Sequence, residues 1–320
     1  MIGLGRLDND LAGWIDRTLV VPGIVPPEHF EEAFVAIVTS SASDPAQAWL
    51  DFYRNTLAAL RGEPEPGGTN AELKPVHERA AALAIGDVLE LGCCFGFLAL
   101  RLAEAGHRVI ASDLTPGTVE LLARTAPQLG LTVETLLADA RAVPLPDAAV
   151  DTVLAVHLIE HLPADEGKVV LAEAIRLARR RVVVAVPFEP EPNETWGHLT
   201  TFDADALHVL GAGTGLPYEI SEHHGGWLIL DSRAPSAAGR PPNTPGQPGL
   251  RAARPGEGAR FAAPRRTSGP GSRAHRGRRV DQDGAWAVRR EAKDVQEASI
   301  SALPARDLRL PGESSQVKAM

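Results

Sequence analysis

The residues best suited to chemistry are acids and glycines that lie at the ends of short apolar runs. Glu90 lies in the apolar run 87–91, and the turn after this run contains Gly92 and Gly96. Glycine lets a backbone turn sharply and approach a ligand closely. A carboxylate beside such a turn suits a cationic ammonium group, whereas it would repel a pyrophosphate. The turn alone also fits dinucleotide enzymes, but together with Glu90 it favours a nucleotide-like ligand with a positive charge.

Two further acids follow the next two apolar runs. Asp113 ends the run 108–113 and precedes Leu114, and Asp139 with Ala140 follows the run 132–138. A carboxylate at the end of a second strand can accept hydrogen bonds from both ribose hydroxyls of an adenosyl group. Asp113 alone would also fit an acid at a helix N-terminus. Acids in order at three strand ends favour a ligand with an amino-acid part, a ribose and an adenine.

Candidate proton acceptors follow the later apolar runs. Glu160 and His161 come after the run 151–156, and His198 comes after the run 181–186. Neutral imidazole accepts protons near physiological pH, so His161 and His198 are the leading candidates for a general base, with Glu160 as a third catalytic candidate. As an alternative, His161 caps the short helix after it. His157 is a candidate for packing beside an adenine.

A metal site is a weaker alternative in the same region. Glu189, Glu191 and His198 offer ligands for Mg²⁺, because carboxylate oxygens suit hard cations. Their spacing is not diagnostic, so the sequence assigns no metal ligand, and a divalent metal stays a hypothesis. Cys93 and Cys94 are neighbours in sequence and poorly placed to bridge each other, which favours packing over a metal or redox role.

The elements that would position these residues form an α/β pattern. Helical patterns over 97–105, 116–126 and 166–178 alternate with apolar runs, and the arginines 179–181 are interpreted as a solvated helix end. We predict a Rossmann-like, doubly wound, mostly parallel seven-stranded sheet that ends in a β-hairpin. The predicted strands are 87–91, 108–113, 132–138, 151–156, 181–186, 218–222 and 227–230.

Three regions are predicted along the chain. Residues 1–75 carry apolar residues at helical spacing and are expected to form a helical cap or substrate-facing region, or a packing appendage. Residues 76–231 are expected to form the α/β domain. Residues 232–320 are rich in Pro, Gly and Arg, and we predict that this tail is disordered. Such a sequence also fits translation of a G+C-rich gene out of frame.

Charge and composition narrow the classes of partner. The chain has 32 Lys and Arg, of which 17 lie from Arg233 onward, and 41 Asp and Glu, of which 8 lie there. The residues before Arg233 therefore hold 15 basic and 33 acidic side chains and are strongly acidic. Such a body would repel nucleic-acid phosphates. No apolar run approaches the roughly 20 residues of a membrane span, and no signal peptide is visible. We therefore expect a cytoplasmic location and a small-molecule partner.

The ordered motifs resemble those of class I S-adenosylmethionine-dependent methyltransferases. The resemblance covers residues 76–231 and rests on the stretch 90–96, Asp113, the pair 139–140 and the stretch 151–162. It implies S-adenosylmethionine as cofactor, with the first loop on the methionine part, Asp113 on the ribose, and Asp139 and Ala140 on the adenine. Cys94 stands where that family usually has glycine. The cofactor-binding residues implied are Glu90, Gly92, Cys94, Gly96, Asp113, Leu114, Asp139, Ala140 and His157.

A subfamily resemblance suggests the methyl acceptor. The loop 94–97 and the stretches 52–57 and 197–202 resemble mycofactocin oligosaccharide methyltransferases, which implies O-methylation of a glycan hydroxyl. A quinone precursor is an alternative acceptor, and a cofactor-binding protein without catalysis is another alternative. A short-chain nicotinamide oxidoreductase is disfavoured, because neither Tyr53 nor Tyr218 has a Lys four residues later.

Overall fold

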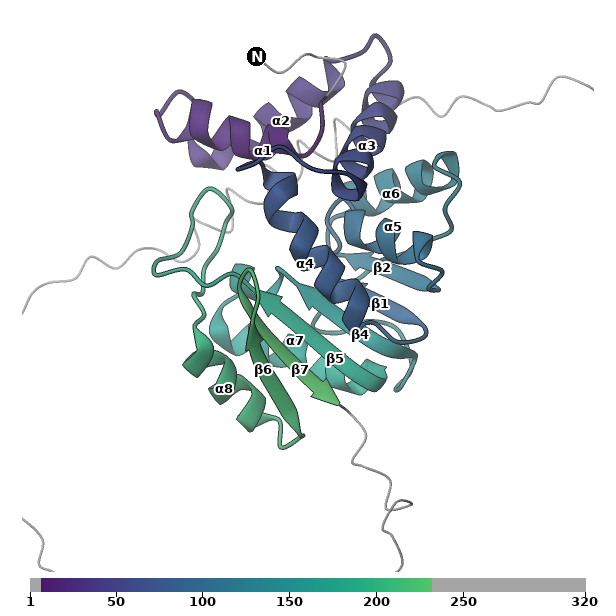
Figure 1. Ribbon diagram of the computed structural model, residues 1–320, viewed down its shortest axis with the longest axis vertical. Helices are drawn as coiled ribbons and strands as arrows, with labels where there is room; N and C mark the ends of the chain where they lie inside the picture. Colours follow the sequence, from purple (N-terminus) through teal and green to yellow (C-terminus); the bar gives the residue numbers. More distant parts are fainter. Residues whose placement is uncertain (1–6, 232–320) are drawn as a thin grey trace, which may run out of the picture.

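The computed structural model describes residues 7–231 of the chain. Its core is one mixed seven-stranded sheet in the order β3-β2-β1-β4-β5-β7-β6 (Figure 1). Neighbouring strands from β3 to β5 run parallel, whereas β7 pairs antiparallel with both β5 and β6. The strands are β1 (Val88–Leu91), β2 (Val109–Asp113), β3 (Glu134–Leu137), β4 (Val150–Val156), β5 (Ala178–Val186), β6 (Tyr218–Glu222) and β7 (Gly226–Asp231). The predicted Rossmann-like sheet and its terminal hairpin are confirmed.

Helices cover both faces of this sheet. The N-terminal elements are α1 (Asp10–Ile15), the π-helix η2 (Asp16–Val20), the 3₁₀ turn η3 (Pro27–His29), α2 (Phe30–Thr39), α3 (Pro45–Arg61) and α4 (Thr69–Leu83). The later ones are α5 (Phe97–Glu104), α6 (Pro116–Gln128), the 3₁₀ turn η4 (Ile159–His161), α7 (Ala164–Leu177) and α8 (Ala204–Gly213). Helices α4, α5 and α6 pack on one face, and α7 and α8 pack on the other.

Both faces of the central strands are largely buried, which explains why their sequences are mostly apolar. Along β5, Val183 and Ala185 join the core that includes the N-terminal helices, whereas Val182 and Val184 join the core beneath α7. Because side chains alternate between the faces of a strand, a parallel strand covered on both sides must be apolar throughout.

The N-terminal helices share a core with the sheet. Trp49, Tyr53 and Leu57 of α3 are buried in the same cluster as Val88 of β1. In Figure 1, α1, α2 and α3 form a layer beyond one end of the sheet, and α4 runs from this layer onto the sheet. The predicted boundary between residues 75 and 76 falls inside α4, so the division into a cap and a domain stays a prediction. The predicted tail from residue 232 lies outside the described residues.

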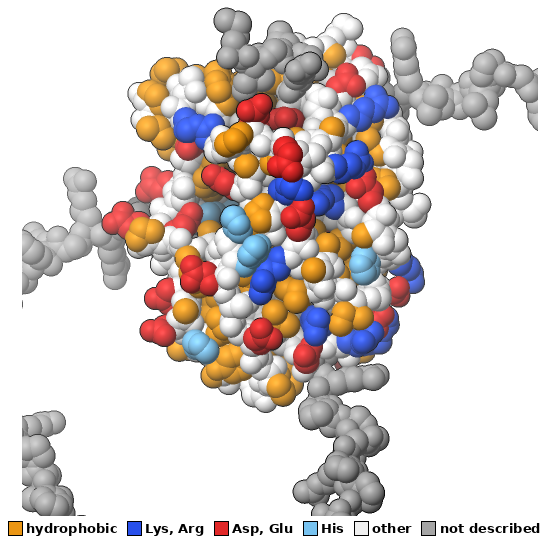
Figure 2. All heavy atoms as spheres, viewed as in Figure 1, with side chains coloured by type: hydrophobic (Ala, Val, Ile, Leu, Met, Phe, Trp, Pro, Cys, Tyr) orange, Lys and Arg blue, Asp and Glu red, His pale blue; other side chains and the backbone are white. Residues whose placement is uncertain are grey.

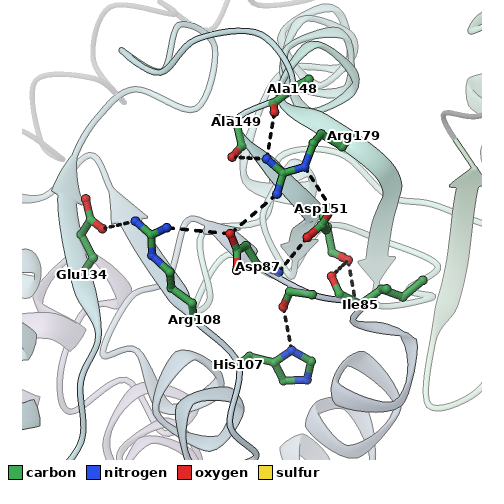
Figure 3. A network of polar contacts seen from close by, with 11 residues as sticks. Ile85, Asp87, His107, Arg108, Glu134, Ala148, Ala149, Asp151 and Arg179 are labelled. Atoms are coloured by element: carbon green, nitrogen blue, oxygen red, sulfur yellow. Dashed lines mark hydrogen bonds and ion pairs between the residues drawn. The ribbon is translucent and has the colours of Figure 1, made fainter.

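The interpretation of the arginines 179–181 as a helix end is wrong. The strand β5 begins at Ala178, so these residues belong to the sheet at its amino edge. Arg179 Nε donates to Asp151 Oδ1 at 3.0 Å, and its Nη2 lies 3.6 Å from Asp87 Oδ2. Figure 3 shows this network continuing through Arg108 to Glu134. Carboxylates from neighbouring strands thus neutralise the arginines and stabilise the edge opposite the candidate site.

The strand order also locates a ligand site. The chain passes outward from β1 through β2 to β3, and then crosses to β4 on the other side of β1. In open α/β sheets, ligands bind beyond the carboxyl ends of the strands at such a switch point. The loops after β1 and β4 are therefore the places to examine. Within residues 7–231, every helix falls short of the length and apolar character that a membrane span needs.

Candidate functional site

The loop after β1 has a backbone that most side chains would resist. Gly92 and Gly96 have φ of 69° and 74°, and Cys94 between them has φ of 49°. A Cβ on Gly96 would lie 2.5 Å from Leu122 Cδ2, so this glycine is required by packing as well as by φ. A non-glycine residue at positive φ is uncommon and often marks a functional position. Cys94, which stands where the resembled family usually has glycine, thus adopts a backbone conformation that favours glycine.

Cys94 is not a nucleophile in this setting. Its side chain reaches solvent, but the protein atoms packed around it, followed by the nearby Asp113 carboxylate, raise the pKa of its thiol to about 12. Cys93 is buried, and burial raises the pKa of its thiol as well. Since the thiolate is the reactive form, both cysteines are unreactive at neutral pH.

Glu90 presents an unpaired carboxylate oxygen at the end of β1. The side chain is only 4% exposed, and its Oε2 has no hydrogen-bond partner. Burial raises the pKa of this carboxyl to about 8; the backbone N–H of Ala99 opposes the shift, and Asp113 adds to it. A buried carboxyl with an open oxygen is costly unless a ligand completes it. Glu90 is therefore suited to a cation beside the first loop.

Asp113 links the first loop to the next helix. Its Oδ2 accepts a hydrogen bond of 2.9 Å from the backbone N–H of Cys94, and its Oδ1 accepts one of 2.9 Å from the N–H of Thr115. Each carboxylate oxygen can accept a further hydrogen bond. Leu114 is 53% exposed next to it and offers an apolar surface at the same edge.

Asp139 has a partner that the sequence analysis missed. Arg141 Nε and Nη2 both donate to its carboxylate, Nη2 at 2.6 Å to Oδ2, and Arg141 also binds Glu166. The hydrogen bond from Arg141 is the main reason that the pKa of Asp139 is lowered. The structure thus places Asp139 and Ala140 after β3, with the carboxylate held by a guanidinium. The one sign of this ion pair in the sequence is that Arg141 lies two residues after Asp139.

His157 and Glu160 follow β4 in an unusual arrangement. His157 has φ of 53°, and its Nδ1 lies 3.8 Å from Glu160 Oε1. Burial and the neighbouring His198 lower the pKa of His157 to about 4, so it is neutral at pH 7. Glu160 is 1% exposed, and neither of its carboxylate oxygens has a hydrogen-bond partner. Burial, with a smaller contribution from Glu189, raises the pKa of Glu160 to about 8.

The segment after β5 brings His198 to this point. The rings of His161 and His198 meet edge to face, with centroids 4.8 Å apart. Glu189 Oε2 lies 2.6 Å from His198 Nδ1. The structure therefore brings all three predicted catalytic residues, Glu160, His161 and His198, into one cluster. Glu191 is exposed and lies outside it, so the predicted magnesium set of Glu189, Glu191 and His198 is not assembled.

The N-terminal helices contact the loop after β1 and the segment after β5. Tyr53 of α3 donates its hydroxyl to the backbone oxygen of Phe95 at 2.8 Å. Phe30 of α2 meets Trp196 of the segment after β5, with ring centroids 5.4 Å apart. These aromatic contacts connect regions far apart in sequence, and spacing alone gave no signal for them.

Acidic side chains gather near the segment after β5. On the face in Figure 2 they line the left margin of the molecule, where Figure 1 places this loop between β5 and α8. Glu191 and Glu194 are exposed members of the loop. An anionic acceptor would be repelled along this margin.

The comparisons with known proteins agree with this geometry. Residues 88–181 match the family described as "Methyltransferase domain". This part of the chain is therefore similar to a methyltransferase domain. The matched residues include β1 to β4, the start of β5 and the loops after β1, β2 and β4. The segment after β5, the strands β6 and β7, and the N-terminal helices lie outside them.

Individual relatives of the methyltransferase domain cover part of the chain. An uncharacterised protein of Mycobacterium tuberculosis is 33% identical over 171 residues, which are 46% of this chain and 60% of that protein. A demethylmenaquinone methyltransferase of Thermus thermophilus is 36% identical over 113 residues, 34% of this chain and 50% of that enzyme. The chain thus spans about half the length of these curated relatives.

Among solved structures, magnesium protoporphyrin IX methyltransferase from Synechocystis PCC 6803, crystallised with bound SAH, has a TM-score of 0.42 at 15% identity. The similarity covers 56% of this chain and 92% of that one.

Proposed function

We propose that the protein binds S-adenosylmethionine and transfers its methyl group to a small-molecule acceptor. The observation that carries the proposal is the unpaired, buried Oε2 of Glu90 beside the loop 92–96. The ammonium group of a methionine moiety supplies the cation that this oxygen lacks, and the positive-φ loop lets the backbone approach the ligand.

The residues at the next strand ends fit the rest of this cofactor. Asp113 retains acceptor capacity for ribose hydroxyls, and exposed Leu114 supplies an apolar surface for the adenine. Asp139 and Ala140 follow as the adenine-side pair. Arg141 holds the Asp139 carboxylate ionised and oriented, so that its remaining lone pairs can accept the adenine amino group.

Methyl transfer requires alignment of the acceptor and removal of its proton. The acceptor oxygen attacks the methyl carbon, the C–S bond breaks with its electron pair staying on sulfur, and the hydroxyl proton leaves to a base. S-adenosylmethionine supplies the electrophilic carbon, and the protein supplies orientation and the base. His198 is poised for the second task, because a proton on Nδ1 shared with Glu189 leaves Nε2 as an acceptor.

For the acceptor, we propose a hydroxyl of a sugar in a mycofactocin-type oligosaccharide. Support comes from the resemblance of the stretches 52–57, 94–97 and 197–202. The first two touch through Tyr53 and Phe95, and His198 of the third lies beside His161 after β4. A hydroxyl with its high pKa needs the base or Lewis acid that the cluster around His198 offers.

A quinone precursor is the second candidate acceptor. The Thermus thermophilus relative is named a demethylmenaquinone methyltransferase, and the aromatic side chains Phe30 and Trp196 meet across the site. Aromatic side chains stack on flat apolar rings as readily as on the apolar faces of sugars.

The experiment uses the full chain in two stages. Calorimetric titration with S-adenosylmethionine, with NADH as control, is expected to give binding of the methyl donor alone; binding of NADH alone would overturn the proposal. Methyl-labelled cofactor is then incubated with the oligosaccharide and, separately, with a demethylated quinone. Label on the glycan supports the acceptor that we propose, label on the quinone replaces it, and cofactor binding without any label transfer would indicate a non-catalytic binding protein.

A further inference from the structure

We propose that Glu160, His161 and His198 bind one divalent transition-metal ion beyond the carboxyl end of β4. Each of these residues offers one ligand atom, and the three atoms all lie within 4.8 Å of one another. They come from η4 and from the segment after β5, which are separate in sequence and meet only in the fold. Among the described residues, this is the one group of at least three such side chains close enough to share an ion.

The strongest sign of a missing ligand is the Glu160 carboxylate. It is 1% exposed, and neither Oε1 nor Oε2 has a hydrogen-bond partner. His157 Nδ1 lies 3.8 Å from Glu160 Oε1, beyond hydrogen-bond distance. Buried carboxylates are normally paired or coordinate a metal, because an unpaired one is costly. A cation between Glu160 and the two histidines would remove this cost.

His198 is already oriented as a metal ligand. Its Nδ1 lies 2.6 Å from Glu189 Oε2, and the ring is 8% exposed. Metal-binding histidines almost always give their other ring N–H to a carboxylate or carbonyl, which fixes the tautomer and makes the ligating nitrogen more basic. Glu189 therefore acts as the positioning residue that leaves His198 Nε2 for the ion.

The backbone around the cluster is held in place from both sides. The backbone oxygen of Glu160 accepts hydrogen bonds from the N–H groups of Leu199 at 2.7 Å and Thr200 at 3.0 Å. Thr200 Oγ1 also donates to the oxygen of Leu162 at 2.7 Å. Ligand atoms around an ion with bonds of about 2.1 Å are about 3 to 3.5 Å apart. Small side-chain rotations would close the remaining gap on this fixed backbone.

The donor set selects the class of metal. Two imidazoles and one carboxylate suit Zn²⁺, Co²⁺, Mn²⁺ or Fe²⁺ rather than Mg²⁺, which prefers oxygen ligands only. Three protein ligands leave a coordination position open. Resting on the proposed function, we infer that this position takes the acceptor hydroxyl. The ion would lower the pKa of this hydroxyl before methyl transfer, and would replace His198 Nε2 as the group that activates it.

The test measures metal binding alone, without cofactor or acceptor, so it is independent of methyl transfer. The untagged full chain is stripped with a chelator and titrated with Co²⁺ while visible absorption is recorded. We expect one Co²⁺ per chain, with the intense bands of a four- or five-coordinate site that Zn²⁺ removes and Mg²⁺ does not. The absence of stoichiometric binding, or a spectrum of hydrated Co²⁺ only, would overturn the proposal.

Variants locate the site. Glu160→Gln and His198→Ala should remove the Co²⁺ bands, and Glu189→Gln should weaken Co²⁺ binding by about 10- to 100-fold. His208→Ala, an exposed histidine on α8, is the matched control and should bind as the unsubstituted protein does. Circular dichroism checks the fold of each variant. If His198→Ala does not fold, Glu160→Gln tests the metal site, because glutamine keeps the shape of the side chain. Co²⁺ binding by Glu160→Gln equal to that of the unsubstituted protein would contradict the assignment.

Discussion

The carboxylate of Asp113 accepts the backbone N–H of Cys94 at 2.9 Å, so the end of β2 holds the loop after β1 in its positive-φ conformation. The same carboxylate binds the N–H of Thr115 at the start of α6. Asp113 therefore has a structural task in the ligand-free protein as well as the proposed task of binding ribose.

Replacing Asp113 should weaken cofactor binding. In Asp113→Ala the ribose hydroxyls and the Cys94 N–H lose their acceptor, at about 1–3 kcal/mol for each group left unpaired. We expect the Kd for S-adenosylmethionine to rise at least about tenfold in calorimetric titration. Asp205→Ala, an exposed acid in the first turn of α8, is the control and should leave the Kd unchanged. Equal affinities for both variants would show that Asp113 does not bind the ribose.

Cofactor affinity should depend on pH through Glu90. Its pKa in the folded protein is about 8, so the carboxyl is protonated at pH 7, whereas a bound ammonium favours the carboxylate. Binding should therefore release a proton below pH 8, and affinity should rise as the pH approaches 8. Calorimetry in buffers of different ionisation enthalpy measures this proton. In Glu90→Gln the amine of the cofactor still titrates, but residue 90 does not. The difference in proton release between the two proteins therefore measures the contribution of Glu90. Identical proton release in both would refute its role.

The same shift has a consequence for the stability of the ligand-free protein. A carboxyl whose pKa is raised on folding contributes its full stability below the unfolded pKa of about 4.5 and loses it as the pH rises to about 8. The slope is at most about 1.4 kcal/mol per pH unit in this window. Glu90→Gln should thus be more stable than the unsubstituted protein at pH 9, as measured by urea unfolding. A stability difference that does not change between pH 5 and pH 9 would contradict the raised pKa.

The hydrogen bond from Tyr53 to Phe95 should stabilise the first loop. Tyr53→Phe leaves the partly buried oxygen of Phe95 without its 2.8 Å donor, which should lower the free energy of unfolding by about 0.5–1.5 kcal/mol. The matched control is Tyr218→Phe, because the only other tyrosine is exposed on β6. Urea denaturation of both variants measures the difference, and equal losses would mean that the bond contributes nothing specific.

Local sequence patterns predicted most of the sheet. Apolar runs located each strand to within a few residues. The reason is clearest for the central strands, which are mostly apolar because both of their faces are buried, and the Gly-rich turns marked the first loop and the hairpin. The start of β5 was missed because arginines in sequence indicate a solvated segment. In the fold, Arg179 pairs with Asp151 of β4 and with Asp87 just before β1. The sequence of one segment does not show which carboxylates from other segments will lie beside it in the fold.

The sequence predicted which residues of the candidate site lie at strand ends, but not which side chains contact each other. The sequence placed Glu90, Asp113 and His161 at strand ends, and parallel topology brings such ends to one edge. It did not show that Glu189 would orient His198. Nor did it show the contact between Phe30 and Trp196, because tertiary packing brings these distant segments together and local hydrophobic periodicity does not indicate it.

The last prediction concerns the two histidines. Because the imidazoles of His161 and His198 meet edge to face beside the buried Glu160, removal of either should spare cofactor binding and lower kcat by about 10²- to 10⁴-fold, whether the ring accepts the proton or holds the proposed ion. Turnover and cofactor Kd of His161→Ala and His198→Ala are measured against His208→Ala. A loss of Kd with unchanged kcat would move these residues to the cofactor site. Full activity in both variants would transfer the search for a base to His157, whose lowered pKa leaves it neutral at pH 7.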